Sequence, residues 1–397
     1  MRTRHGIAWL SFLCASILLP GAARPMDASC ASAPQQLDDW ETASPEDVGI
    51  DAAVLCKITQ ELAAQGNHAA ALPDRRNVHA VLVVRHGKLV FEAYAAGKDE
   101  NWVEPLGVVP HDAATKHDVQ SISKSVVSLL FGIALERKLI AGTDVPVMSF
   151  FPEYAELKTP KWDKILLRHL LSMTPGYDWN EDMVWMDPYS TERAMYEAAD
   201  PYRYILGREV VYEPDARWQY NSGATTLLGA VLKKSTGKSL DDFAKEALFE
   251  PLHIEDVEWG RMINGEPAPG AGLRLRPRDT AKIGQLVLNG GTWHGQRVVP
   301  EDWVKQSTKP RFNASWGGGM LQYGYQWWLG TSPFGAGRTV DWIAAFGGGG
   351  QRIFIVPTLD LVVVTNAGLY ADGDQSAIVR TIFEYRVLPA IRDPVQQ

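Results

Sequence analysis

The alternation of apolar and polar positions predicts a β-hairpin near each end of the chain. Residues 79–94 carry two β-branched and aromatic runs on either side of a short turn at Gly87, and this pattern is typical of two paired strands. A second pair of runs, 352–356 and 361–365, flanks a turn that begins at Pro357. We expect both hairpins to share one antiparallel sheet, closed by the two ends of the chain.

Between the hairpins, apolar residues recur at the i, i+3, i+4 spacing that predicts helices. The predicted helices cover residues 121–137, 166–172, 225–234, 240–247 and 279–288. Two further helices are predicted outside this region, at 53–64 and at 375–388, and the second of them could cover the sheet.

These elements predict an α+β fold, in which an antiparallel sheet is flanked by helices. A mainly helical lobe, roughly residues 125–300, is inserted between the sheet segments, and a cleft between the lobes is the expected place for a site. We expect residues 37–397 to form this single domain.

Composition and charge narrow the functional classes. The 397 residues are 46% hydrophobic and 22% charged, which indicates an ordinary globular protein. The formal net charge is −8 and no basic run occurs, which argues against a nucleic-acid partner.

The first residues have the pattern of a secretory signal. A basic start precedes an apolar stretch at residues 7–19, and small residues suggest cleavage near Ala23. The stretch is too short for a stable bilayer-spanning helix, and no further long apolar run supports an N-terminal membrane anchor. We expect a signal peptide over 1–23, a linker over 24–36, and export to the periplasm or the medium without a membrane span in the mature chain.

Cysteines and histidines show no metal-binding pattern. Cys30 and Cys56 remain after signal cleavage; they could bridge in an oxidising compartment, although the sequence contains no information on their geometry. No HExxH motif occurs, and the nine scattered histidines are expected at the surface or in packing roles. We therefore expect neither a metal nor a cofactor.

A serine and a lysine stand three residues apart in the segment SISK, Ser121 to Lys124, at the start of an apolar helix. This spacing places both on one helix face, and the first turn favours developing negative charge near Ser121. A desolvated lysine has a lowered pKa and can take the proton of a serine hydroxyl. A second SxxK, Ser235 to Lys238, is predicted to be a C-terminal helix turn because it lies beside a glycine.

Tyr220 is the expected partner that protonates the leaving group. It lies in a polar turn just before an apolar helix, and a neighbouring lysine ammonium would lower the pKa of its phenol. A core tyrosine is the alternative interpretation, but the presence of Ser121 and Lys124 favours a catalytic role.

Together these residues resemble the penicillin-recognising serine hydrolases, specifically the class C β-lactamase-like branch. SxxK is the first motif of that family, and its second motif, YxN, corresponds to Tyr220-Asn221-Ser222. Further similar blocks lie at residues 166–174, 276–285, 325–328 and 349–354. The resemblance extends from about Leu37 to the C-terminal helix and implies the β-lactamase-like fold.

Two departures from the family pattern concern the substrate. Ser222 replaces the asparagine of YxN, and the third motif, near Phe346 and Gly347, lacks the basic residue that recognises a carboxylate. A backbone N–H near Phe346 could still form an oxyanion hole with the N–H of Ser121. These departures are similar to those of the esterase and 6-aminohexanoate-dimer hydrolase members, and the resemblance thus implies a small ester or linear amide substrate.

Aromatic and acidic residues near the family's pocket segments leave two interpretations open. Trp179, Trp185, Trp327 and Trp328 could line an aromatic cleft or belong to the core. Asp178, Glu181 and Asp182 could meet a cationic substrate end or form a solvated acidic loop.

The sequence therefore predicts an exported serine hydrolase that acts through an acyl-enzyme on Ser121. One alternative is a β-lactamase or DD-peptidase acting on β-lactams or peptidoglycan peptides, and another is a non-catalytic binding module of the same fold. An α/β-hydrolase is excluded because GxSxG does not occur. The oligomeric state stays open.

Overall fold

The computed structural model describes residues 30–65, 77–102, 104–181, 189–314, 320–370 and 372–392. The predicted signal segment lies outside these residues. Among the helices of the described chain, none is both long enough and apolar enough to cross a bilayer.

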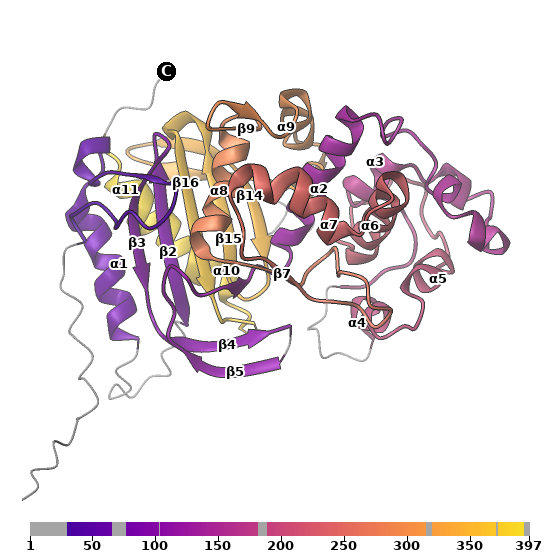
Figure 1. Ribbon diagram of the computed structural model, residues 1–397, viewed down its shortest axis with the longest axis horizontal. Helices are drawn as coiled ribbons and strands as arrows, with labels where there is room; N and C mark the ends of the chain where they lie inside the picture. The colour runs from indigo at the N-terminus through magenta and orange to yellow at the C-terminus, as the bar shows by residue number, and fades with distance from the viewer. Residues whose placement is uncertain are drawn as a thin grey trace, which may run out of the picture.

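One large sheet combines both ends of the chain (Figure 1). Within the described residues it has nine strands in the order β1-β3-β2-β16-β15-β14-β13-β12-β11. Their bounds are β1 (Glu41–Thr42), β2 (Val78–Arg85), β3 (Lys88–Tyr94), β11 (Phe312–Asn313), β12 (Gln322–Tyr323), β13 (Trp328–Phe334), β14 (Arg338–Gly347), β15 (Gln351–Val356) and β16 (Leu361–Ala367). Val83 of β2 lies opposite Val363 of β16 in an antiparallel pair, so the predicted hairpins are neighbours in one sheet. The predicted α+β fold is confirmed.

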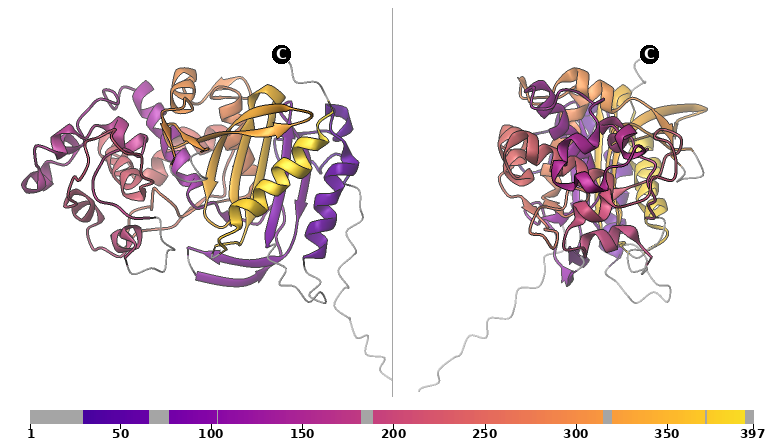
Figure 2. Two further views of the ribbon diagram at one scale, coloured as in Figure 1. Left: turned by 180° about the vertical axis from the view of Figure 1, so that it is seen from behind. Right: turned by 90° about the vertical axis from the view of Figure 1, so that its right-hand side faces the viewer.

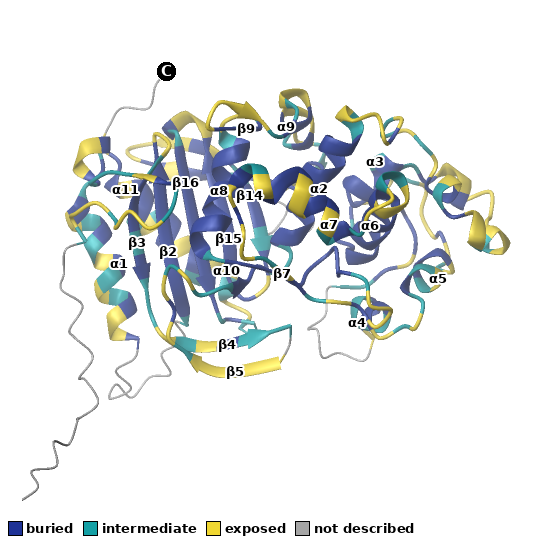
Figure 3. Ribbon diagram, in the orientation of Figure 1, coloured by how far each residue is buried: buried dark blue, intermediate teal, exposed yellow. Residues whose placement is uncertain are grey.

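Helices cover both faces of this sheet, which explains the continuous apolar runs of its central strands. Every residue of β2, β15 and β16 is buried, as the dark central strands of Figure 3 show. Helix α8 (Pro277–Leu288) lies on the face seen in Figure 1. On the other face lies α10 (Gln375–Ile382), visible in Figure 2, together with α1 (Ala52–Ala64).

A helical lobe extends from the sheet, on the right in Figure 1. Four of the five helices predicted between the hairpins belong to it, and α2 lies at its junction with the sheet. The fifth, α8, packs on the sheet instead, although the predicted lobe of residues 125–300 included it. The bounds are α2 (Ile122–Glu136), α3 (Leu167–Leu171), α4 (Thr191–Tyr196), α5 (Pro201–Leu206), α6 (Ser222–Thr236), α7 (Leu240–Ala244) and α9 (Glu301–Ser307). Helix α6 ends at Thr236 with Gly237 in the left-handed region, which confirms the C-terminal turn predicted for the second SxxK.

Several short elements were not predicted. The hairpin of β4 (Gly97–Asn101) and β5 (Glu104–Val109) escaped notice because β5 is mostly exposed and shows no apolar alternation. The last predicted helix is divided into α10, η9 (Phe383–Val387) and α11 (Leu388–Ala390). The remaining elements are β6 (His117–Asp118), β7 (Glu258–Trp259), β8 (Leu273–Leu275), β9 (Thr292–Trp293), β10 (Gln296–Arg297), η1 (Glu46–Val48), η2 (Val147–Phe150), η3 (Pro152–Leu157), η4 (Trp162–Lys164), η5 (Lys245–Phe249), η6 (Glu250–Leu252) and η8 (Pro357–Leu359).

A disulfide joins Cys30 to Cys56, with 5.4 Å between the two Cα atoms. Cys56 belongs to α1. The bond therefore ties the predicted linker, in which Cys30 lies, to a helix that packs on the sheet.

Close packing of α8 on the sheet leads to a stability prediction. A Cβ at Gly284 would lie 2.6 Å from Val362 Cγ1 and 2.7 Å from Ile353 Cγ2. Both neighbours are stiff side chains of buried strands, so Gly284→Ala should force α8 away from the sheet. Overpacking of this kind lowers the free energy of unfolding by about 1–3 kcal/mol, against a gain of about 1 kcal/mol in helix propensity. We expect a net loss, measured as a lower midpoint in chemical denaturation.

The matched control is Gly142→Ala, because a Cβ at Gly142 meets no atom within 4 Å. Its unfolding midpoint should stay close to that of the unaltered protein. Equal stability of the Gly284→Ala variant would contradict the tight packing described.

Candidate active site

Ser121 is the N-cap residue of α2, and its hydroxyl is not used to cap the helix. The preceding residue, Gln120, has a φ of 50°, a left-handed conformation that is strained for a residue with a side chain. Ser121 is partly exposed, whereas most of the helix that follows is buried. The serine oxygen thus lies at the surface end of a buried helix.

Lys124 is almost completely buried, and its ammonium group faces Ser121. Its Nζ donates to Ser121 Oγ at 3.0 Å and to the carbonyl oxygen of Gly270 at 2.8 Å. The same nitrogen lies 4.8 Å from the ring centroid of Tyr220. The helical spacing of SxxK therefore produces the expected contact.

The charge state of Lys124 differs from the expectation. Burial by itself lowers the pKa of this amine, but the electrostatic effects of Tyr220, Glu181 and Glu192 in their ionised forms outweigh it and raise the pKa above its ordinary value. The prediction of a lowered pKa was wrong because it considered desolvation and not the acidic neighbours. At neutral pH the group is an ammonium, which has no lone pair to accept a proton.

Tyr220 lies directly before α6 and is buried, with its phenol hydrogen-bonded to the side chains of Ser121 and Lys124. Burial raises the pKa of the phenol, and the favourable effects of Lys124 and Ser121 do not reverse it. The predicted lowering of this pKa was also wrong. Asn221 then caps α6, since its Oδ1 accepts from Ala224 N at 2.8 Å.

Two glutamates converge on Ser222, and the sequence did not single out one of them, Glu192. Ser222 is fully buried, and its hydroxyl lies 3.0 Å from Glu181 Oε2 and 2.6 Å from Glu192 Oε1. One hydroxyl hydrogen cannot serve both carboxylates, so this arrangement favours a proton on one of them. Burial and the charge of Glu192 raise the pKa of Glu181 to about 8.

The acidic segment is therefore divided between two environments. Asp178 is exposed and pairs with Arg208, as expected for a solvated acidic loop. Glu181 instead accepts hydrogen bonds from the backbone N–H of Ser222 and from Trp179 Nε1. Asp182 lies outside the described residues. No local pattern distinguishes Glu181 from Asp178, because its partners lie elsewhere in the chain.

The third-motif strand β14 ends against the segment that leads to Ser121. A Cβ at Gly347 would lie 2.3 Å from the carbonyl oxygen of Val119 and 3.1 Å from Gln120 Cβ. Only glycine allows so close an approach of the two backbones. Gly347 is thereby brought beside the serine-bearing turn.

Phe346 is connected to Tyr220 through a stack of aromatic rings. The ring of Phe346 stacks on Trp328 at 5.4 Å between centroids, and Trp328 stacks on Tyr220 at 5.7 Å. Opposite Phe346 in the sheet, Arg352 places its guanidinium 4.6 Å from the Phe346 centroid. The side chains of Tyr220, Trp328, Phe346 and Arg352 therefore form one continuous stack.

Arg352 is a buried cation whose hydrogen bonds stay within the protein. It donates to the carbonyl oxygens of Gly347 at 2.5 Å and Gln351 at 2.7 Å, and to Ser376 Oγ at 2.9 Å. Burial lowers the pKa of its guanidinium to about 10. Because only 4% of the residue is exposed, it does not replace the missing basic residue of the third motif as a surface anchor.

Of the four tryptophans singled out from the sequence, Trp185 lies outside the described residues and the other three are buried. Trp179 is 2% exposed and packs beside Gly223, and Trp327 has no exposed surface. The structure brings Trp179 to Glu181, and it places Trp328 rather than Trp327 against Tyr220.

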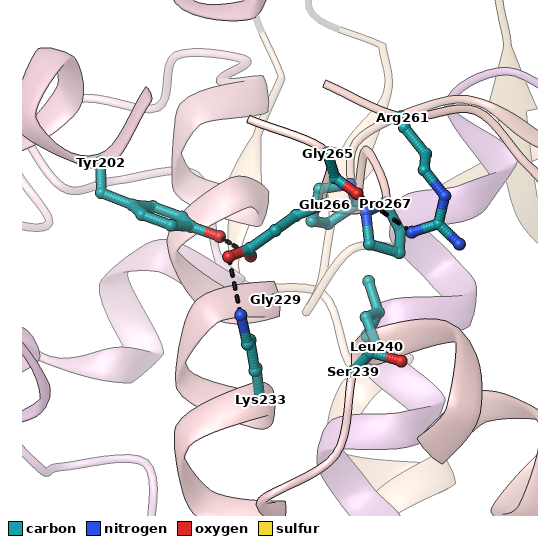
Figure 4. A pocket seen from close by; sticks show the side chains of 10 residues that line it. Tyr202, Gly229, Lys233, Ser239, Leu240, Arg261, Gly265, Glu266 and Pro267 are labelled. Atoms are coloured by element: carbon teal, nitrogen blue, oxygen red, sulfur yellow. Dashed lines mark hydrogen bonds and ion pairs between the residues drawn. The ribbon is translucent and has the colours of Figure 1, made fainter. Parts of the chain in front are cut away.

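Two surface pockets belong to the helical lobe and do not include Ser121, Lys124 or Tyr220. Figure 4 shows one of them, where Tyr202 and Lys233 converge on Glu266. Because that carboxylate already binds both groups, the pocket presents no unpaired charge to a ligand.

Comparison with known proteins identifies the family. The family model described as Beta-lactamase matches residues 65–372, which is most of the chain. The protein belongs to the Beta-lactamase family. Family membership and hydrolase relatives support a hydrolase, while the roles of Ser121, Lys124 and Tyr220 stay predictions.

Individual relatives include hydrolases of several kinds. The 6-aminohexanoate-dimer hydrolase of Paenarthrobacter ureafaciens is 25% identical over 326 residues, which cover 75% of each chain. A Bacillus anthracis structure classed as a 6-aminohexanoate-dimer hydrolase has a TM-score of 0.66 at 20% identity and covers 89% of this chain and 87% of its own. EstCE1, a hydrolase with promiscuous acyltransferase activity, has a TM-score of 0.64 at 16% identity, with 83% and 97% covered.

The charges around Lys124 lead to a pH prediction. Glu181 is ionised in the alkaline range where Lys124 loses its proton, so Glu181→Gln removes a negative charge that raises the pKa of Lys124. We expect the rate of fluorophosphonate labelling of the protein to rise with pH, because deprotonation produces the proton acceptor. In Glu181→Gln the midpoint of this rise should move down by about 0.5–1 pH unit.

Glu197→Gln is the matched control, since Glu197 is an exposed partner of Arg193 near the end of α4. Its midpoint should equal that of the unaltered protein. An upward shift, or none, in Glu181→Gln would refute the assigned role of the carboxylate.

Proposed function

We propose that the protein is an exported serine hydrolase that cleaves a small ester or a linear amide through an acyl-enzyme on Ser121. The observation that carries this proposal is the 3.0 Å contact between Lys124 Nζ and Ser121 Oγ. A buried ammonium is costly to maintain, and here it contacts the one partly exposed hydroxyl at the start of α2.

Lys124 and Tyr220 act as one titrating unit in the proposed mechanism. Both have raised pKa values. At neutral pH the amine and the phenol are therefore both protonated, and the pair cannot accept the serine proton. Loss of one proton from the pair creates the acceptor for the Ser121 proton, whichever of the two groups releases it. Ser121 Oγ then attacks the carbonyl carbon, and Tyr220, which contacts both other groups, is placed to return the proton to the leaving alcohol or amine.

The oxyanion is proposed to bind to two backbone N–H groups. One is the N–H of Ser121 at the start of α2, where unpaired N–H groups and the helix dipole favour negative charge. The second comes from the end of β14, near Phe346 and Gly347, because Gly347 brings that backbone against the turn before Ser121. Water then hydrolyses the acyl-enzyme.

The proposed substrate class follows from the positive charges near the third motif. Ala345 stands where the resemblance places a basic residue, and the donors of Arg352 are used inside the protein. A substrate carboxylate therefore lacks its usual anchor, which supports neutral esters or linear amides over penicillins. The names of the relatives, a 6-aminohexanoate-dimer hydrolase and the hydrolase EstCE1, support the same class.

The nucleophile is tested by intact-protein mass after brief exposure to a fluorophosphonate probe. We expect a single adduct on the unaltered chain and none on Ser121→Ala, since an activated serine attacks the phosphorus. Ser235→Ala, in the second SxxK, should keep the adduct. Turnover of the Ser121→Ala variant should fall by at least about 10³-fold, and comparable turnover would exclude the mechanism.

Substrate preference is measured on the same preparations with short p-nitrophenyl esters, linear amides and nitrocefin. We expect ester or amide turnover that exceeds nitrocefin turnover. Preferred nitrocefin turnover would establish the β-lactamase or DD-peptidase alternative. A folded protein without an adduct would establish the binding-module alternative.

Export is supported by the disulfide between Cys30 and Cys56, because such bonds persist mainly in oxidising compartments outside the cytoplasm. We expect the protein from the periplasm or the medium to lack residues 1–23 and to contain no free thiol. Mass spectrometry before and after reduction measures both properties. An uncleaved, reduced chain that remains in the cytoplasm would contradict export.

A further inference from the structure

Four buried side chains meet at the edge of the sheet. They are separate from the side chains of the serine site, although one of them, His117, lies only four residues before Ser121 in the sequence. His79 lies in β2, Asp99 in β4, His111 after β5, and His117 in β6. One nitrogen or oxygen atom of each lies within 4.8 Å of the corresponding atoms of the others. We call these four residues the histidine cluster; each is at most 9% exposed.

The hydrogen bonds of His79 determine which of its ring nitrogens carries a proton. Nε2 lies 3.0 Å from Asn77 Oδ1. The amide of Asn77 is oriented by its Nδ2, which donates to the carbonyl oxygens of Lys98 at 2.7 Å and Gly368 at 3.0 Å. Oδ1 is therefore the atom that faces His79, and Nε2 must be the donor. In the neutral ring, Nδ1 is then a bare lone pair.

The same reasoning applies to His117. Its Nδ1 lies 3.0 Å from the carbonyl oxygen of Asp118, which can only accept a hydrogen bond. Nδ1 therefore carries the proton, and Nε2 of the neutral ring is a bare lone pair.

These two bare nitrogens face each other. His79 Nδ1 and His117 Nε2 are 2.9 Å apart, so two neutral rings would bring two lone pairs into repulsive contact. A cation is required between or beside them, either an extra proton or a metal ion.

The other two members of the cluster distinguish these cations. Asp99 Oδ2 and His111 Nε2 are buried and have no hydrogen-bond partner, although they lie 3.7 Å apart. A single proton between His79 and His117 would leave both unsatisfied.

We propose that the histidine cluster binds one divalent transition-metal ion of the zinc type, through His79 Nδ1, His111 Nε2, His117 Nε2 and a carboxylate oxygen of Asp99. Three imidazoles and one carboxylate suit zinc and related ions in a tetrahedral arrangement, and they do not suit Ca²⁺ or Mg²⁺, which prefer oxygen ligands.

The surroundings of the cluster match those of a metal site. Ligand histidines usually donate their second ring N–H to a carbonyl or carboxylate, as His79 does to Asn77 and His117 does to Asp118. Asp99 is oriented by the hydroxyl of Tyr370, which donates to Oδ1 at 2.9 Å. The bound ion would tie β6, shortly before Gln120 and Ser121, to β2 and to the β4–β5 hairpin (Figure 1). Because all four ligands are enclosed, the role is structural rather than catalytic.

The test measures the metal content of the full chain, produced with zinc in the medium and purified without chelators or a polyhistidine tag. We expect one zinc ion per chain by plasma mass spectrometry. After removal of the metal, addition of Co²⁺ should produce the visible absorption of a tetrahedral site, and Zn²⁺ should raise the melting temperature whereas Mg²⁺ should not. A folded chain that binds neither Zn²⁺ nor Co²⁺, even after refolding in their presence, would overturn the proposal.

Variants then assign the ligands. The double variant Asp99→Asn and His111→Gln should lose the zinc and the cobalt spectrum, while His294→Gln, which alters an exposed histidine outside the cluster, should keep both. Zinc retained by the double variant at the level of the control would refute this ligand set. If the double variant does not fold, the metal content and cobalt spectrum of the unaltered chain decide the question.

Discussion

The ammonium of Lys124 is the charge on which the site depends. A cation removed from water needs nearby dipoles or opposite charge, and here the Gly270 carbonyl, Ser121 Oγ and more distant carboxylates supply them. The acids are close enough to keep the amine protonated, yet they bind Ser222 rather than Lys124 itself. The amine therefore stays protonated and in contact with Ser121 without a direct ion pair to a carboxylate.

The site is assembled where three elements end. Helix α2 contributes Ser121 at its first turn, α6 is preceded by Tyr220, and β14 ends at Gly347. Backbone N–H or C=O groups are unpaired at the end of a helix or strand, whereas those in its interior are hydrogen-bonded. Gly347 and the stack of Trp328 on both Tyr220 and Phe346 fix the distance between the lobes at this point, so the geometry depends on packing of residues that perform no chemistry.

Local patterns predicted the parts of the protein that local physics determines. The hairpins and helices follow from apolar spacing, and the Ser121–Lys124 contact follows from three residues of helix. The pairing of Glu181 and Glu192 on Ser222 could not be predicted, because it joins segments whose proximity arises only in the folded chain. The raised pKa of Lys124 was missed for that same reason, whereas the raised pKa of Tyr220 was missed because it depends on burial of the phenol in the folded chain.

The histidine cluster could not be predicted from the sequence either, because its members come from separate segments. His79, His111 and His117 follow no ligand spacing, since they lie on a strand, a loop and a short bridge that the sheet lobe brings together. Strands β13 and β14 were also overlooked, although they form the longest pair beside the site. Polar and apolar residues alternate in β14 only from Thr339 to Trp342, and β13 contains a glycine and a proline, so neither strand shows a long run with a period of two.

The pairing of β2 with β16 has a consequence for biosynthesis. Arg85 is the partner of Leu361, so the first hairpin leaves the ribosome long before its neighbour exists. At about 5–20 residues per second, that interval lasts tens of seconds. During it, β2 has an open edge, and α8, which covers one face of the sheet, has not been made for most of the interval. The pairing of β2 with β16 can form only after residue 361 has been made, so completion of the sheet is a late step of biosynthesis.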